Sequence, residues 1–164
     1  MKLVPLTHEQ LLLYKNNPAA LAENLGVHYQ GRQHDPATID DLTEALEFWI
    51  SHTATYPDRF EWFTNWEIIL KEAQLAIGGI GFAGWPDESG KSMVGYGLDV
   101  RFHGKGYATE ALRALIEWGF QHPTLETILA DTPALHIASQ NVLIKNGFVE
   151  THRDEKLIHW SRHR

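Results

Sequence analysis

The turn between Arg101 and Gly106 has the residue types and spacing of an anion-binding site. Before it comes an apolar, glycine-spaced stretch (92–100) that reads as a strand, and after it comes a helical pattern that begins near Tyr107. Gly104 can adopt a positive φ and Gly106 lets a ligand approach the backbone, so the N–H groups of the first helical turn can converge on one anion. The sequence therefore predicts that a phosphorylated ligand binds where this strand meets the helix.

Charged side chains in the same turn add to this site. Arg101, His103 and Lys105 place positive or protonatable groups around the two glycines. Each hydrogen bond to a charged acceptor contributes about 1.5–3 kcal/mol net. The dipole of the helix adds about 0.3–1 kcal/mol. A handful of these contacts is enough to hold a pyrophosphate.

The composition indicates one soluble domain that spans residues 1–164. Hydrophobic residues make up 43% of the chain, and a net charge of −7 results from 14 Lys and Arg against 21 Asp and Glu. A nucleic-acid-binding face needs clustered positive charge, so this balance argues against nucleic acid as a partner. Net negative charge suits cationic acceptors such as amines, and it equally serves solubility alone.

The chain contains no cysteine, which excludes disulfides and a covalent thioester intermediate. Any acyl transfer would therefore proceed by direct attack of the acceptor on a bound thioester. No apolar stretch is long enough for a signal peptide or a membrane span, so we expect a cytoplasmic protein without a membrane partner. The ten histidines lack the spacing of a metal site, so we expect no metal, and we expect His159 and His163 to be exposed surface without chemistry.

Alternating and helical patterns predict a mixed α/β (α+β) fold in which helices flank one sheet. The predicted strands cover residues 3–6, 66–70, 75–82, 92–100, 127–130, 148–151 and 156–160. The first predicted helix follows Thr7, and the others cover residues 18–24, 40–56, 107–122 and 133–146. Hairpins make most of the sheet antiparallel, but a helix connects the strand 92–100 to the strand 127–130, so these two should be parallel.

A second pattern lies downstream of the glycine turn. It reads His136-x-x-Ser139-x-x-Val142-x-x-Lys145-x-Gly147-Phe148. The first pattern, Arg101-x-x-Gly104-x-Gly106 opening a helix, resembles the acetyl-CoA signature of the GNAT N-acetyltransferases. Together the two are most similar to the ribosomal-protein N-terminal (Rim-type) branch of that family, which has asparagine in place of His136. The resemblance covers the C-terminal half of the chain, and the N-terminal half matches only in its coarse pattern.

This resemblance implies the GNAT fold, a mostly antiparallel sheet of about six to seven strands with a splayed central parallel pair. It implies acetyl-CoA as co-substrate, lying in the V-shaped opening where the strands 92–100 and 127–130 separate. Unpaired backbone groups there would bind the pantetheine arm and polarise the thioester carbonyl. The implied cofactor-binding residues are Leu98, Val100, Arg101, Phe102, His103, Gly104, Lys105, Gly106, Tyr107, Ala108, His136 and Lys145.

The resemblance also suggests catalytic residues. Ser139, at the serine of the second pattern, is the candidate that protonates the departing thiolate or orients the sulfur. The base is less determined, because Met93 stands approximately where many Rim-type relatives carry a glutamate, and a thioether cannot accept a proton. Asp99, near the splay, is the candidate that we name, with Glu67 on the neighbouring strand and a chain of waters as alternatives.

Acceptor contacts are expected in the loop 27–36 and in the aromatic segment 56–66. The resemblance places the loop 27–36 beside the acceptor, which makes His28 a predicted substrate-binding residue. Trp62 and Trp66, from the aromatic segment, are predicted to form a further wall of the acceptor site. Burial of the aromatic residues under the sheet edge is the alternative. The predicted acceptor is a primary amine on a small molecule or at a peptide N-terminus, and the oligomeric state is open, a homodimer included.

Three function classes fit these observations. The first is an N-acetyltransferase that acts on a primary amine. The second is a catalytically silent acyl-CoA-binding or regulatory module, which the residues Met93 and His136 favour. The third is a nucleotide-binding domain that uses the same glycine turn for another phosphate ligand. Binding of acetyl-CoA rather than ATP separates the third class from the others, and turnover with an amine separates the first from the second.

Overall fold

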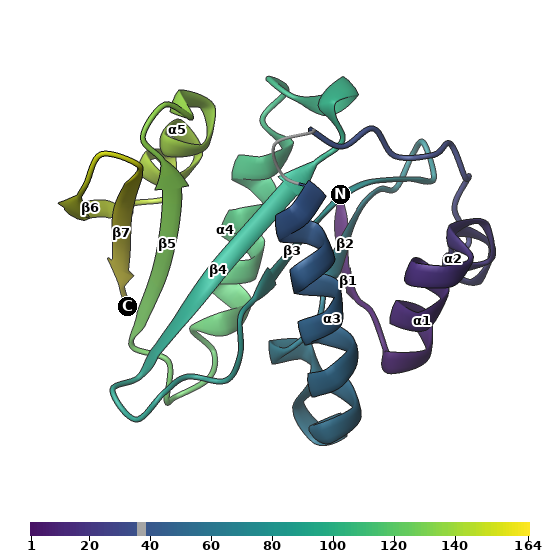
Figure 1. Cartoon of the computed structure of the whole chain (residues 1–164), viewed down its shortest axis with the longest axis horizontal. Coiled ribbons are helices and arrows are strands. Elements are labelled where there is room, and N and C mark those ends of the chain that lie inside the picture. The colour runs from purple at the N-terminus through teal and green to yellow at the C-terminus, as the bar shows by residue number, and fades with distance from the viewer. Residues whose placement is uncertain (36–38) are drawn as a thin grey trace.

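A mixed sheet of seven strands runs through the part of the chain that the structure describes, residues 1–35 and 39–164 of a computed structural model (Figure 1). The strands are β1 (Lys2–Pro5), β2 (Trp66–Leu70), β3 (Leu75–Phe82), β4 (Lys91–Leu98), β5 (Thr127–Pro133), β6 (Val149–Arg153) and β7 (Leu157–His163). Their order across the sheet is β1-β2-β3-β4-β5-β7-β6. The pair β4–β5 is parallel and the remaining pairs are antiparallel, which confirms the predicted fold class.

Helices cover both faces of this sheet. The α-helices are α1 (His8–Asn16), α2 (Pro18–Leu25), α3 (Ile39–Thr55), α4 (Tyr107–Gly119) and α5 (Ile137–Lys145), and two short 3-10 helices are η2 (Pro57–Trp62) and η3 (Val100–Phe102). The predicted capping box between Thr7 and Gln10 begins α1, and Gly26 ends α2 with φ 67°. Pro36, the predicted end of the first long loop, lies outside the described residues.

The two helical layers bury different side chains. Residues of α4 and α5, such as Leu112, Leu115 and Leu143, share the main core with Ile80 and Ile128 of the sheet. A smaller cluster, built around Leu6, Leu11 and Leu21, packs α1 and α2 against α3. In Figure 1, α4 lies behind the sheet and α3 in front of it. The face that α3 covers is therefore opposite the face that α4 covers.

The strands β4 and β5 are hydrogen-bonded only at their first residues. Lys91, Ser92 and Met93 pair with residues 127–129. Beyond these residues β4 continues to Leu98 and β5 to Pro133, and the two strands no longer pair with each other. Figure 1 shows the two strands together at their lower ends and apart at their upper ends. The predicted splay of the central parallel pair is confirmed.

Several predicted boundaries move by a few residues. The strand β4 ends at Leu98, because the Asp99 side chain accepts a hydrogen bond from the Arg101 N–H and winds residues 100–102 into η3. The strand β5 continues past Ala130, because β7 pairs with it as far as residue 133. The helix α5 correspondingly begins at Ile137 instead of residue 133.

Trp62 and Trp66 lie in the main core and are 3% and 7% exposed. The Trp62 ring lies 4.8 Å from that of Trp118 and 4.9 Å from that of Phe82. The Trp66 indole N–H donates to the Glu61 carbonyl oxygen at 2.8 Å. Their burial contradicts the prediction that they contact the acceptor, and the alternative of aromatic burial at the sheet is correct for both.

Two paired glycines show where protein stops covering the face of the sheet on which α3 lies. Gly81 and Gly95 are partners in the β3–β4 ladder. A Cβ added to Gly81 would lie 2.4 Å from the Thr64 carbonyl oxygen, whereas one added to Gly95 would meet nothing within 4 Å. We expect Gly81→Ala to destabilise the protein by about 1–3 kcal/mol through overpacking. Gly95→Ala should leave the free energy of unfolding nearly unchanged in denaturant titrations, and equal losses in both variants would contradict this assignment.

Candidate functional site

The glycine turn before α4 has the conformation that anion binding requires. Gly104 and Gly106 have φ values of 74° and 84°, and a Cβ on either would meet nothing within 4 Å. Gly106 is the N-cap of α4 and provides no side-chain cap. Among the described residues, no hydrogen bond engages the N–H groups of residues 104–108. These exposed amides point out of a helix N-terminus, where the dipole favours an anion.

The Arg101 side chain is not available to this turn. Its Nε donates to Asp99 Oδ1 at 2.9 Å, and its Nη2 donates to Asp99 Oδ2 and to the Gly31 carbonyl oxygen, each at 2.6 Å. The prediction that the Arg101 guanidinium holds the cofactor is therefore not supported. Lys105 remains exposed, with its ammonium group 5.2 Å from the centre of the Phe102 ring. His103 lies on the same turn and donates from Nε2 to the Leu98 carbonyl oxygen at 3.1 Å.

Asp99 is a buried structural anion and not a base. Besides Arg101, the Gln33 N–H donates to Asp99 Oδ2 at 3.0 Å, and the side chain is 2% exposed. The hydrogen bonds from Arg101 hold the pKa of this carboxyl group well below its usual range. A carboxylate with these partners does not take a proton from an ammonium group at neutral pH. The predicted catalytic role of Asp99 is wrong, because the same bonds that fix the loop occupy its oxygens.

The backbone of β4 presents a different set of groups to the splay than the sequence predicted. The Asp99 N–H donates to the Ile77 carbonyl oxygen at 2.8 Å, and the Val100 N–H donates to the Gln33 carbonyl oxygen at 3.0 Å. The predicted contact of the Val100 amide with the pantetheine is therefore wrong. Because bonding alternates along an antiparallel ladder, Tyr96 and Leu98 turn their N–H and C=O groups toward β5. The Leu98 carbonyl oxygen already accepts from His103, so the Leu98 N–H is the group that remains for the predicted contact with the cofactor.

Tyr96 and Ser139 meet across the open end of the two strands. The Tyr96 hydroxyl lies 2.9 Å from Ser139 Oγ and donates to the Ser139 carbonyl oxygen at 3.2 Å. Ser139 belongs to the first turn of α5, so this contact joins β4 to α5 where no strand pairing remains. Burial raises the pKa of Tyr96 to about 12, which keeps the phenol protonated. Tyr96 is a site residue that the sequence analysis missed, although its alternation with Val94 places it on the α4 side.

The remaining residues of the second pattern lie on or beside α5. His136 is the exposed N-cap of this helix, and Lys145 is exposed in its last turn. The next residue, Asn146, donates from Nδ2 to the Thr109 carbonyl oxygen at 3.2 Å. This bond fixes the end of α5, where Lys145 lies, against the first turn of α4.

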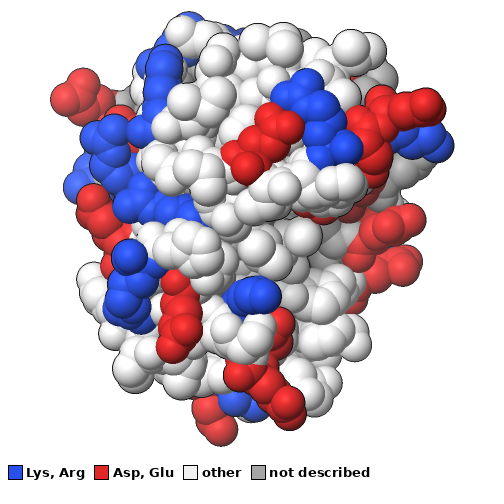
Figure 2. Space-filling view, turned by 90° about the vertical axis from the view of Figure 1, so that its left-hand side faces the viewer, with Lys and Arg blue, Asp and Glu red and all other residues white. Residues whose placement is uncertain are grey.

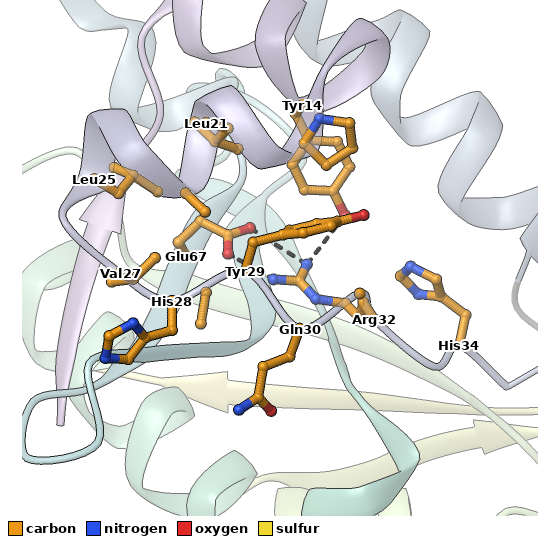
Figure 3. Close-up of a pocket in the computed structure, with 14 residues that line it drawn as sticks. Tyr14, Leu21, Leu25, Val27, His28, Tyr29, Gln30, Arg32, His34 and Glu67 are labelled. Carbon is orange, nitrogen blue, oxygen red and sulfur yellow. Dashed lines mark hydrogen bonds and ion pairs between the residues drawn. The ribbon is translucent and has the colours of Figure 1, made fainter.

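A cavity of about 290 Å³ lies between α1, α2 and the loop that precedes α3 (Figure 3). Its apolar wall comes mainly from α2, and the loop residues 27–34 line the rest together with Glu67 of β2. Figure 3 shows Arg32 pointing into the cavity toward Glu67 and Tyr14, whereas His28 and Gln30 point away from this ion pair. The predicted substrate residue His28 is thus at the exposed rim. Burial lowers the pKa of His34, which also lines the cavity.

Glu67 is held inside this cavity and is 1% exposed. Arg32 Nη2 donates to its Oε2 at 2.6 Å, and Asn65 Nδ2 donates to its Oε1 at 2.7 Å. Register places Glu67 opposite Gly79 of β3, which in turn lies opposite Gly97 of β4. Two strand spacings, about 10 Å, therefore separate Glu67 from the splayed strand. The alternative in which Glu67 acts as base has little support, because Arg32 and Asn65 occupy its two oxygens inside the protein.

Charges of both signs are intermixed on the side of the molecule that faces left in Figure 1 (Figure 2). β6, which lies at that side, contains one such pair, in which Arg153 Nη2 donates to Glu150 Oε2 at 2.7 Å. Among the described residues, no group of three metal-ligating side chains lies close enough to hold an ion. In that same part of the chain, no helix is long and apolar enough to cross a membrane.

The family model for the acetyltransferase (GNAT) domain matches residues 2–149 of this chain. The chain belongs to the GNAT family. This match confirms the resemblance to the GNAT family drawn from the two sequence patterns.

Individual relatives agree with this assignment. The chain is 35% identical over 98 residues to YjdG of Bacillus subtilis (strain 168), an uncharacterized N-acetyltransferase. That match covers 60% of this chain and 58% of YjdG, so this chain spans a little over half the length of this relative.

Solved structures show the same fold at low sequence identity. The ribosomal-protein-S5-alanine acetyltransferase of Vibrio fischeri superposes with a TM-score of 0.67 at 19% identity, covering 98% of this chain and 91% of that one. The aminoglycoside acetyltransferase AAC(6')-Ib in complex with coenzyme A superposes with a TM-score of 0.61 at 20% identity, covering 99% and 94%.

Replacing Asp99 by asparagine tests its structural role. We expect Asp99→Asn to lower the free energy of unfolding at pH 7 by about 1–3 kcal/mol, because hydrogen bonds to a charged group are lost. The folded pKa of Asp99 lies below the unfolded value of about 3.9, so the carboxylate stabilises the fold above that pH and loses this contribution as pH falls toward the folded pKa. The stability difference between the two proteins should therefore be full at pH 7 and shrink below about pH 4.

Urea titrations at pH 7 and pH 3 measure this difference. Glu150→Gln serves as a control, because it removes a carboxylate from an exposed ion pair on β6 and should change stability little. Equal stability of wild type and Asp99→Asn at pH 7 would show that the pair with Arg101 contributes nothing to the fold.

Proposed function

We propose that this protein is an acetyl-CoA-dependent N-acetyltransferase that transfers the acetyl group directly to a primary amine. The observation that carries this proposal is the splay of β4 from β5 beside the free amides of α4. The splay turns the backbone groups of Tyr96 and Leu98 toward a gap that Ser139 borders from the other side. A thioester bound in this gap has hydrogen-bond donors at its carbonyl oxygen and a hydroxyl group near its sulfur.

The glycine turn is the proposed site of the coenzyme A diphosphate. The amides of residues 104–108 and the exposed Lys105 supply donors and positive charge. Phe102 and Tyr107, whose rings lie 6.4 Å apart, flank these amides, and His103 and Lys145 lie nearby. His136 stands at the start of α5, where its imidazole can donate one hydrogen bond to the pantetheine.

The proposed reaction has one bond-forming and one bond-breaking event. The neutral amine attacks the thioester carbonyl carbon, a C–N bond forms, and the C–S bond breaks. The amine nitrogen loses a proton to a base, and the thiolate gains one by way of Ser139. The Tyr96 hydroxyl, which stays protonated because its pKa is raised to about 12, hydrogen-bonds Ser139 Oγ and holds it in position. Solvent restores the proton that Ser139 passes to the thiolate.

The acceptor amine is proposed to enter from the α3 side, over Gly95 and Gly97. A Cβ added to either glycine would meet nothing within 4 Å, and Met93, on the same face, is 40% exposed. Structural neighbours named as acting on ribosomal-protein S5 alanine or on aminoglycosides share an amine-bearing acceptor. The ion pair of Arg32 and Glu67 is electrically neutral, so we expect the nearby cavity to select acceptors by shape and hydrogen bonding.

Thiol release from acetyl-CoA over a panel of amines and peptides tests the activity. We expect release that depends on acceptor concentration, and an about 10-fold lower kcat in Ser139→Ala with little change in the KM for acetyl-CoA. Binding of coenzyme A without turnover on any amine or peptide would support a silent acyl-CoA-binding module instead. Stabilisation by ATP and not by acetyl-CoA would remove the proposal altogether.

A matched pair of glycine variants tests the diphosphate site. Gly106 and Gly26 both have a positive φ and open space around the Cβ position, but only Gly106 lies at the α4 N-terminus. We expect Gly106→Ala to raise the KM for acetyl-CoA about 10-fold or more, because the new methyl group and the strained backbone displace the amides from the phosphates. Gly26→Ala should lose similar stability without a change in this KM. A normal KM in Gly106→Ala would place the diphosphate elsewhere.

A further inference from the structure

An aspartate and a histidine meet on β5 and β7, beyond the point where β4 leaves β5. Register pairs Asp131 directly with His159. His159 Nδ1 lies 2.7 Å from Asp131 Oδ1, and each side chain is about one-third exposed. No local sequence pattern indicates this contact, because 28 residues separate the two and only the strand pairing joins them. The prediction that His159 is an exposed surface residue without a chemical role did not include its contact with Asp131.

Both side chains lie on the face from which the acceptor is proposed to approach. Met93 pairs with Leu129, and strand alternation places Gly95 and Asp131 on the same face as these two residues. His159 shares that face because it lies directly opposite Asp131. The intervening residues, such as Ala130 and Ile158, are buried in the core on the opposite face. The pair thus borders the open side of the splay, across from the bare backbone of Gly95.

The contact with Asp131 determines which nitrogen of His159 can accept a proton. A carboxylate accepts and does not donate at neutral pH, so Nδ1 carries the hydrogen of the neutral imidazole. Nε2 then holds the lone pair and lies 3.7 Å from Asp154 Oδ2, a separation too long for a hydrogen bond. Other carboxylate–histidine pairs that act as bases use the imidazole in this tautomer. The charged and titratable groups that face His159 are Asp131 from β5, His152 from β6 and Asp154 from the turn after β6.

The distance across the strands sets how the proton travels. β7 is the second strand from β4, so the backbones of His159 and Gly95 are at least about 10 Å apart. An imidazole covers only part of that distance, and the nitrogen that faces Asp131 is Nδ1. The proton therefore passes between the amine and Nε2 through ordered water.

Resting on the proposed acetyltransfer function, we propose that His159, oriented by Asp131, is the general base that deprotonates the acceptor ammonium. Nε2 takes one proton from the ammonium group through ordered water, which leaves the neutral amine to attack the thioester. The proton returns to solvent after the acetylated product leaves. This assignment supplies a base at a site where Met93 cannot accept a proton and where Asp99 and Glu67 are engaged inside the protein.

Steady-state kinetics of His159→Gln and Asp131→Asn test this role. We expect His159→Gln to lower kcat/KM for the amine about 100-fold or more while the KM for acetyl-CoA stays within about 2-fold. Its pH–rate profile should lose the limb on which the wild-type rate falls with acidification. Added imidazole should restore part of the rate, and Asp131→Asn should lose about 10-fold.

The matched control is His163→Ala. His163 lies on the same strand and face but contacts Thr127 at the paired end of β4 and β5, with Nδ1 3.0 Å from the hydroxyl oxygen. It should keep the wild-type rate and pH profile. Calorimetric binding of coenzyme A by His159→Gln confirms that this variant folds.

The possible results separate the two proposals. An active wild type with an unchanged rate and pH profile in His159→Gln overturns the role of His159 and leaves the proposed function standing. If His34→Ala lost activity and His159→Gln did not, the base would instead be His34, which lines the cavity beside α2. A wild type without turnover on any amine would instead overturn the proposed function itself.

Discussion

The separation of β4 from β5 after three residue pairs is the constraint on which the rest of this structure depends. A paired strand would satisfy the backbone groups of Tyr96 and Leu98 with other backbone groups. Here those groups face a gap, which the protein borders with α5 on one face and leaves uncovered on the other. Backbone atoms, rather than side chains, therefore form the main polar surface along β4.

The end of β4 is fixed by a second interaction, the ion pair of Asp99 and Arg101. Its members also bind Gln33 and Gly31, so the loop before α3 and the turn before α4 are anchored at the same place. The bridge between His28 and Leu75 and the ion pair of Arg32 with Glu67 of β2 hold the same loop against the sheet, which limits its conformational freedom. The cavity and the anion-binding turn thereby share one structural support.

The sequence was sufficient for the features that local chemistry determines. Gly104 and Gly106 indicated a positive φ and a helix N-terminus, Thr7 and Gln10 indicated a capping box, and a helical connection required the parallel pair. The prediction failed where long-range contacts decide the role of a side chain. Asp99 was predicted to be a base, but Arg101 and Gln33 donate hydrogen bonds to its carboxylate oxygens. Trp62 and Trp66 were predicted to line the acceptor site, but both are buried in the core. Tyr96 and His159 acquired their partners only through folding.

The contact between Tyr96 and Ser139 has a consequence for the energetics of ligand entry. Because a hydrogen bond of the protein itself spans the gap, the opening does not depend on a bound molecule to keep its width. Coenzyme A would then meet a preorganised slot, and little of its binding energy would be spent on separating strands. Such a slot favours fast entry of the thioester, because no separation of strands has to precede binding.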